Sequence, residues 1–125
     1  MHKEQWSVAI PGQIDSELQS FLIRQDGQED LLFALWSSSR GLLRHTALLH
    51  SPIYPDEGDR QRHGNVSYNP QYFEKACSIA MSEGCGIAFL HSHPSHGWQR
   101  MSLDDIAAEQ KMAGTVASLT DLPLL

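Results

Sequence analysis

The sequence predicts an α/β (α+β) domain in which helices pack on a mixed β-sheet. Three observations predict this class. Apolar residues recur at helical spacing over 13–26, and continuous apolar runs at 31–36 and 86–90 are typical of buried strands. A second helical segment, 70–83, lies between those runs. The length of 125 residues suits one domain, so we treat residues 1–125 as a single unit.

The chain is expected to begin with a strand and a helix. Residues 5–10 predict a short strand that stops at Pro11. The helix over 13–26 presents an apolar stripe on one side, and Gly27 is expected to cap its end.

Two paired strands are expected next. They cover 31–36 and 42–49 and are joined by a turn at 37–41. The following segment, 51–65, carries prolines and glycines among charges, which predicts a long surface loop.

The second half of the chain predicts a helix, a strand and a helix. Asn69 and Pro70 suit the N-cap and first position of the helix over 70–83. The run 86–90 is interpreted as a central strand. The last helix covers 102–113.

Composition limits the classes of function. A net charge of −6 disfavours nucleic acid as a general partner. No apolar run approaches the roughly 20 residues of a membrane helix, and the N-terminus lacks the apolar core of a signal peptide. Cys77 and Cys85 form neither a disulfide framework nor a CxxC metal clamp, so we expect reduced thiols in the cytoplasm.

Two histidines after the apolar run 86–90 carry the strongest chemical signal. His91 and His93 are two residues apart, so on a strand both imidazoles point to the same face. Pro94 cannot continue a strand, which places the pair at the edge of the sheet. A carboxylate in the first turn of the last helix, Asp104 or Asp105, can complete a His-His-Asp set. Three protein ligands plus water is the composition of a catalytic zinc site.

This pattern resembles the JAMM metalloproteases, the JAB1/MPN/Mov34 family, in its prokaryotic type. His91-x-His93-Pro94 followed by Ser102-x-x-Asp105 is similar to the family signature, and Glu29 matches a glutamate that precedes an apolar strand. The resemblance covers residues 13–113 in the order of their elements. It implies a JAB/MPN-like, cytidine-deaminase-like fold with a mostly antiparallel sheet flanked by helices.

The resemblance implies a zinc isopeptidase or peptidase. Its Zn²⁺ would be held by His91, His93 and Asp105, and its substrate would be ubiquitin, a ubiquitin-like protein or a conjugate of one. Glu29 would act as general base and then general acid. Ser102 would donate to the oxyanion or serve only as an N-cap, and both roles stay open.

The chain departs from the family pattern in two ways. The segment between His93 and Ser102 is one residue longer, so Asp104 keeps the usual distance from the histidine and Asp105 the usual distance from the serine. We prefer Asp105 because a loop absorbs an insertion more easily than a helix does. The apolar end, 121–125, also stops in mid-pattern, so we expect a piece of a longer protein, fused to or associated with an activating-enzyme-like domain.

Two other functions remain alternatives. One is a non-catalytic MPN-type scaffold for protein interactions. The other is a zinc amidase that acts on a small molecule or a sulfur-carrier adduct.

Overall fold

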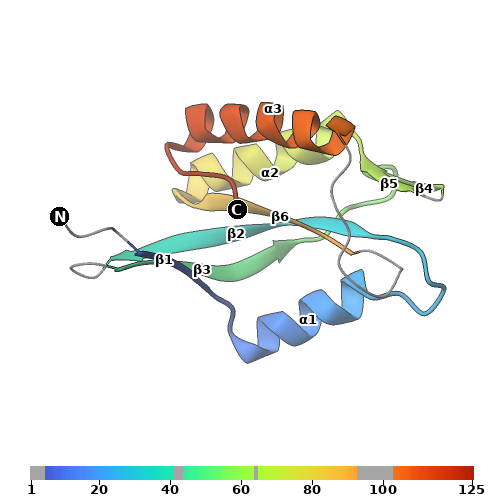
Figure 1. The fold of residues 1–125 in the computed structure, drawn as a ribbon, viewed down its shortest axis with the longest axis horizontal. Coiled ribbons are helices and arrows are strands. Elements are labelled where there is room, and N and C mark those ends of the chain that lie inside the picture. The colour runs from blue at the N-terminus through green and yellow to red at the C-terminus, as the bar shows by residue number, and fades with distance from the viewer. Residues whose placement is uncertain (1–4, 41–43, 64, 93–102) are drawn as a thin grey trace.

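A computed structural model describes residues 5–40, 44–63, 65–92 and 103–125 of the protein (Figure 1). The elements in these ranges are, in order, β1 (Gln5–Ala9), α1 (Gly12–Leu22), β2 (Leu31–Arg40), β3 (Arg44–Ile53), β4 (Arg60–His63), β5 (Asn65–Tyr68), α2 (Pro70–Glu83), β6 (Gly86–His91) and α3 (Leu103–Thr120). Four strands form one sheet in the order β1-β3-β2-β6. The β1–β3 pair is parallel, whereas β3–β2 and β2–β6 are antiparallel. The prediction of a mixed α+β domain is therefore confirmed.

The sheet lies between two helical layers (Figure 1). Helix α1 covers one face, which we call the α1 face, and α2 and α3 cover the other, which we call the α2/α3 face. Alternate residues of β2 point to the two faces: Leu32 packs on the α1 face, whereas Leu31 and Phe33 pack on the α2/α3 face. This explains why the run 31–36 is apolar throughout, since every one of its side chains is buried.

Helix α1 ends earlier than its apolar spacing predicts. The chain is already extended at Ile23. The predicted cap, Gly27, instead belongs to a turn, in which its N–H donates to the carbonyl of Arg24 at 3.3 Å. Gly27 has a φ of +73°, which a residue with a side chain rarely adopts, so the glycine serves this turn and not the helix end.

The predicted turn at 37–41 is wrong for the residues that the structure describes. Strand β2 continues through this serine-rich stretch to Arg40, which lies opposite His45 of β3. The pairing with β3 extends from Phe33 onward, and these cross-strand hydrogen bonds outweigh the weak strand preference of serine.

The predicted loop 51–65 is only partly correct. Strand β3 runs on to Ile53, and β4 and β5 pair with each other as a short antiparallel sheet of their own. The connection between β3 and β4 is therefore only 54–59. It contains a turn in which Asp59 donates its N–H to the carbonyl of Asp56 at 3.0 Å, and Lys75 of α2 binds the carboxylates of both aspartates. The hairpin was missed because its two strands carry little apolar alternation.

Helix α2 has the predicted bounds. Its end at Gly84 has a φ of +67°, the left-handed conformation that favours glycine. Asn69 occupies the N-cap position, but its side-chain amide donates to the carbonyl of Gly58 and does not cap the helix. That contact fastens the start of α2 to the preceding connection.

Strand β6 is not a central strand of the described sheet, because β2 is its only neighbour in the strand order. On its outer side it pairs with the last residue of the chain. Leu125 accepts a hydrogen bond from Phe89 N–H at 2.9 Å and donates to the carbonyl of Ile87 at 3.1 Å (the C label in Figure 1). The two bonds form a parallel bridge that covers part of the β6 edge.

Helix α3 extends seven residues beyond the predicted end at 113. Met112 and Val116, one turn apart, are buried against the α2/α3 face. Tertiary packing thus continues the helix through Gly114.

The start of β6 predicts a sharp intolerance to added volume. A Cβ built on Gly86 would lie 2.2 Å from the indole of Trp36, which is fully buried and donates its Nε1–H to the carbonyl of Ile87. We expect Gly86→Ala to lower the free energy of unfolding by about 3 kcal/mol, the upper part of the overpacking range. Urea denaturation followed by circular dichroism measures it.

Gly114→Ala is the matched control. A Cβ there meets nothing within 4 Å, and the residue lies inside α3, so the change should stabilise the protein by about 0.5–1 kcal/mol. Equal stability of Gly86→Ala and the parent protein would contradict the close packing of Trp36 on β6.

Candidate functional site

His91 is the last residue of β6 and lies opposite Leu31, the first residue of β2. Its ring stacks on that of Phe89, with 5.6 Å between centroids and 26° between planes. Residues directly opposite in an antiparallel pair share a face, so His91 points to the α2/α3 face. This half-buried imidazole therefore lies where the sheet ends, beneath the layer that α3 forms.

The other predicted ligands fall largely outside the described structure. His93 and Ser102 lie outside the described residues. Asp105 lies in the first turn of α3, as does Asp104, but the side chains of both are outside what is described. Helix α3 covers the face on which His91 lies, so the backbone of its first turn belongs to the same side of the sheet (Figure 1).

Glu29, the predicted general base, lies two residues before Leu31, the first residue of β2, and is half-buried. Its neighbour Asp30 is fully buried and points toward Arg24 and Arg60. Alternation of neighbouring side chains predicts that Glu29 points to the side opposite Asp30.

Ser92 joins the two strand ends. Its N–H donates to the carbonyl of Asp30 at 3.0 Å, and its Oγ accepts the N–H of Asp30 at 3.0 Å. Ser92 therefore extends the contact between the two strands by one residue beyond their last regular pair. These two hydrogen bonds hold the segment after Glu29 against the segment after His91, at the point where the regular pairing of β2 and β6 stops.

Asp30 is the centre of a buried ionic network that the sequence analysis missed. Its Oδ1 accepts from Arg60 Nε at 2.6 Å and from the Leu31 N–H at 2.9 Å. Its Oδ2 accepts from Arg60 Nη2 at 3.1 Å and from Arg24 Nη1 at 3.2 Å. Every carboxylate oxygen is thus satisfied, which a fully buried charge requires.

The two arginines are themselves held in place. Arg24 also binds the carboxylate of Asp26, and these hydrogen bonds hold the pKa of Asp26 below its usual range. The guanidinium of Arg60 lies 5.1 Å from the ring centre of Phe21. An aspartate directly before a buried apolar strand was the available signal, because such a carboxylate needs a cationic partner when it is buried.

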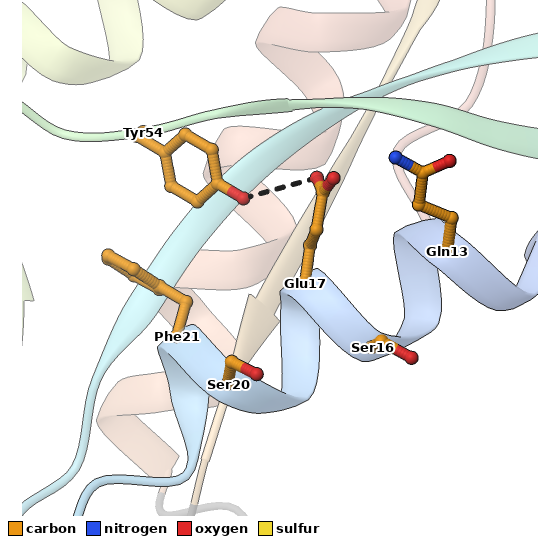
Figure 2. Close-up of a pocket in the computed structure, with 6 residues that line it drawn as sticks. All are labelled: Gln13, Ser16, Glu17, Ser20, Phe21 and Tyr54. Atoms are coloured by element: carbon orange, nitrogen blue, oxygen red, sulfur yellow. Dashed lines mark hydrogen bonds between the residues drawn. The ribbon is translucent and has the colours of Figure 1, made fainter.

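A shallow hollow lies on the opposite side of the sheet from His91 (Figure 2). It is formed by α1 and the chain just after β3, and its lining residues are Gln13, Ser16, Glu17, Ser20, Phe21 and Tyr54. The Tyr54 hydroxyl donates to Glu17 Oε2 at 3.4 Å across it. Burial and the adjacent carboxylate raise the pKa of Tyr54. This hollow contains none of the predicted ligands.

Among the side chains that the structure describes, no three of histidine, cysteine, aspartate or glutamate lie close enough to share a metal ion. The predicted set depends on the side chains of His93 and Asp105, which are not among them.

Comparison with known proteins adds no relative. No protein-family model matches the chain, and no curated protein matches it. None of the helices in the described ranges is long and apolar enough to cross a membrane.

The ionic network predicts a strong effect of neutralising Asp30. Asp30→Asn leaves two guanidinium groups without their shared counter-charge. Because Arg24 and Arg60 are partly solvated, we expect a loss of about 3 kcal/mol, the lower end for a broken buried pair. Denaturant unfolding measures the change.

Asp26→Asn is the control, since it removes a carboxylate from the same arginine at an exposed position. We expect a change several-fold smaller than that for Asp30→Asn, because solvent weakens an exposed ion pair. Similar losses for both variants would show that burial of Asp30 does not set its contribution.

Proposed function

We propose that this protein is a zinc-dependent isopeptidase or peptidase of the JAMM type. It would hydrolyse the amide bond after the C-terminal tail of ubiquitin or a ubiquitin-like protein, in deconjugation or maturation. The observation that carries the proposal is the pairing of residues 30–31, which directly follow Glu29, with residues 91–92. It brings the segment of the proposed base to the strand end of the first proposed ligand.

Further support comes from the position of these residues at the end of the β2–β6 strand pair. Catalytic groups in open sheets gather where strands end, because backbone groups stop pairing there and side chains can converge. Asp30, the acidic neighbour of Glu29, forms ion pairs with two arginines, which neutralise its charge. A carboxylate at position 29 can therefore take part in proton transfer without a second acid competing from the adjacent position.

Each residue would have one role. His91, His93 and Asp105 would hold the ion, which when bound supplies a Lewis acid and a water that loses its proton near neutral pH. Glu29 would accept that proton and deliver it to the departing amine. The Ser102 hydroxyl would donate a hydrogen bond to the carbonyl oxygen of the scissile amide.

The finer assignments belong to the same proposal. The order of the described elements supports a JAB/MPN-like fold, with a mixed sheet between α1 and the pair α2 and α3. We also propose a cytoplasmic location and an activating-enzyme-like domain as fused or associated partner.

The decisive test combines metal content with hydrolysis. The purified protein should contain one zinc ion by elemental analysis. It should also release the fluorophore from ubiquitin that carries a C-terminal aminocoumarin amide, and a chelator should stop that release. Glu29→Gln should keep the zinc but lose at least about 100-fold in rate, because it retains shape but cannot accept a proton. His91→Ala should lose both zinc and activity.

Glu57→Gln is the matched control, since Glu57 is exposed in the connection 54–59. It should keep zinc and full rate. Full activity in Glu29→Gln would remove Glu29 from the mechanism, and a protein without zinc would overturn the proposal as a whole. Zinc without hydrolysis of the ubiquitin amide would favour the scaffold, unless small acyl amides are cleaved, which would favour the small-molecule amidase.

A further inference from the structure

A second group of reactive side chains lies at the other end of the β2–β6 pair. It consists of Ser37 on β2, His50 and Ser51 on β3, and Cys85 directly before β6, and we call it the Cys85 cluster. Ser37 is six residues along β2 from Leu31, the partner of His91, which corresponds to about 20 Å. The Cys85 cluster is therefore separate from the candidate metal site.

A β-bulge brings His50 into the cluster. Leu35 pairs with Ser51 and Trp36 pairs with Leu49, so His50 is the extra residue on β3. Leu49 packs on the α1 face whereas Ile53 packs on the α2/α3 face, although regular alternation would place both on one face. Bulges re-aim side chains and are frequent beside active sites, which makes the histidine at this one informative.

Both nitrogens of the His50 ring have hydroxyl partners. Nε2 lies 2.8 Å from the Oγ of Ser37, and Nδ1 lies 2.7 Å from the Oγ of Ser51. A neutral imidazole accepts at one nitrogen and donates at the other. With Nδ1–H donating to Ser51, Nε2 is the acceptor and faces Ser37. A base held at one nitrogen by a third group is the arrangement that activates nucleophiles.

Cys85 lies against this base. Its Sγ is 3.6 Å from the Oγ of Ser37 and 3.8 Å from the Nε2 of His50. The carbonyl of Glu83 is a further possible acceptor at 3.7 Å. Cys85 is 7% exposed and belongs to the apolar cluster of the α2/α3 face, whereas its partners Ser37 and His50 are half-buried.

The other thiol provides an internal contrast. Cys77 is on the buried side of α2 within the apolar cluster of the α2/α3 face. Burial, and to a smaller extent the charge of Glu74, raise its pKa. Both features disfavour the thiolate, the form that reacts.

We propose that Cys85 is a modification site that reacts with small hydroperoxides, with His50 as the base and Ser37 as the proton relay. The thiol proton passes to the Ser37 oxygen while the Ser37 hydroxyl proton passes to His50 Nε2. The sulfur attacks one oxygen of the hydroperoxide, so an S–O bond forms and the O–O bond breaks. The departing oxygen takes the proton from His50 and leaves as water or an alcohol. The sulfur is oxidised to the sulfenic acid and the peroxide is reduced.

The low exposure of Cys85 limits which oxidants can reach its sulfur. A hydroperoxide as small as hydrogen peroxide needs little access, whereas a bulky disulfide needs the sulfur to be open on one side. The same burial would shield a sulfenic acid once it has formed.

The test compares the two thiols within one folded protein. The folded protein is treated with hydrogen peroxide for increasing times, the peroxide is removed, and the protein is unfolded in urea that contains dimedone, so that sulfenic acid is trapped whatever its burial. Each cysteine peptide is then quantified by mass spectrometry. We expect Cys85 to be labelled at least about 10-fold faster than Cys77. His50→Gln should slow Cys85 by at least about 10-fold and leave Cys77 unchanged.

Two serine variants separate the relay from the packing. Ser37→Ala should slow labelling of Cys85, whereas Ser37→Thr, which keeps the hydroxyl, should restore most of the rate. A loosened fold would speed up Cys77 as well, so the ratio of the two rates distinguishes chemistry from unfolding. Equal rates for both thiols in the parent protein, or an unchanged rate ratio in His50→Gln, would overturn the proposal. The rates should be the same in Glu29→Gln and with chelator, so this test stands apart from that of zinc hydrolysis.

Discussion

The carboxylate of Asp30 is the contact on which the architecture around the candidate site depends. It is fully buried at the start of β2, and it draws together the turn after α1 through Arg24 and the first residue of β4 through Arg60. Its backbone is bound in both directions to Ser92 at the end of β6. The turn after α1, the start of β2, the start of β4 and the end of β6 therefore meet at this one residue. Because an unpaired buried charge is so costly, this network specifies one arrangement of those segments and disfavours alternatives in which any of them shifts.

How much of the fold the sequence predicts depends on whether the signals are local. Helix α2 has its predicted bounds because proline and glycine mark its two ends within the chain itself. The lengths of β2 and β3 are set by each other: the serine-rich stretch after Trp36 is a strand because β3 lies beside it. The hairpin of β4 and β5 has no apolar alternation to reveal it, and α3 runs past its predicted end because Met112 and Val116 find a sheet to pack on. These features arise from tertiary contacts, which propensity and periodicity do not contain.

The same distinction applies to the candidate site. The face and edge position of His91 followed from strand periodicity and from Pro94. The partners of Asp30 did not follow, because Arg24 and Arg60 lie six and thirty residues away and no local pattern links them to it. The bulge at His50 was equally hidden, since an extra residue in one strand is defined only against its partner.

The β2–β6 pair thus separates two polar regions by an apolar one. Residues 31–36 are all buried and apolar, whereas Asp30 and His50 lie where regular pairing is interrupted, at the strand end and at the bulge. This is where backbone and side-chain donors are left to satisfy them.

About 20 Å separates the two regions along β2, more than twice the screening length of about 8 Å at physiological salt. Charge changes at one end therefore have little direct effect at the other. Any influence between them has to pass through the register of β2 against β6, which the tight contact of Trp36 with Gly86 and the bonds between Asp30 and Ser92 hold at both ends.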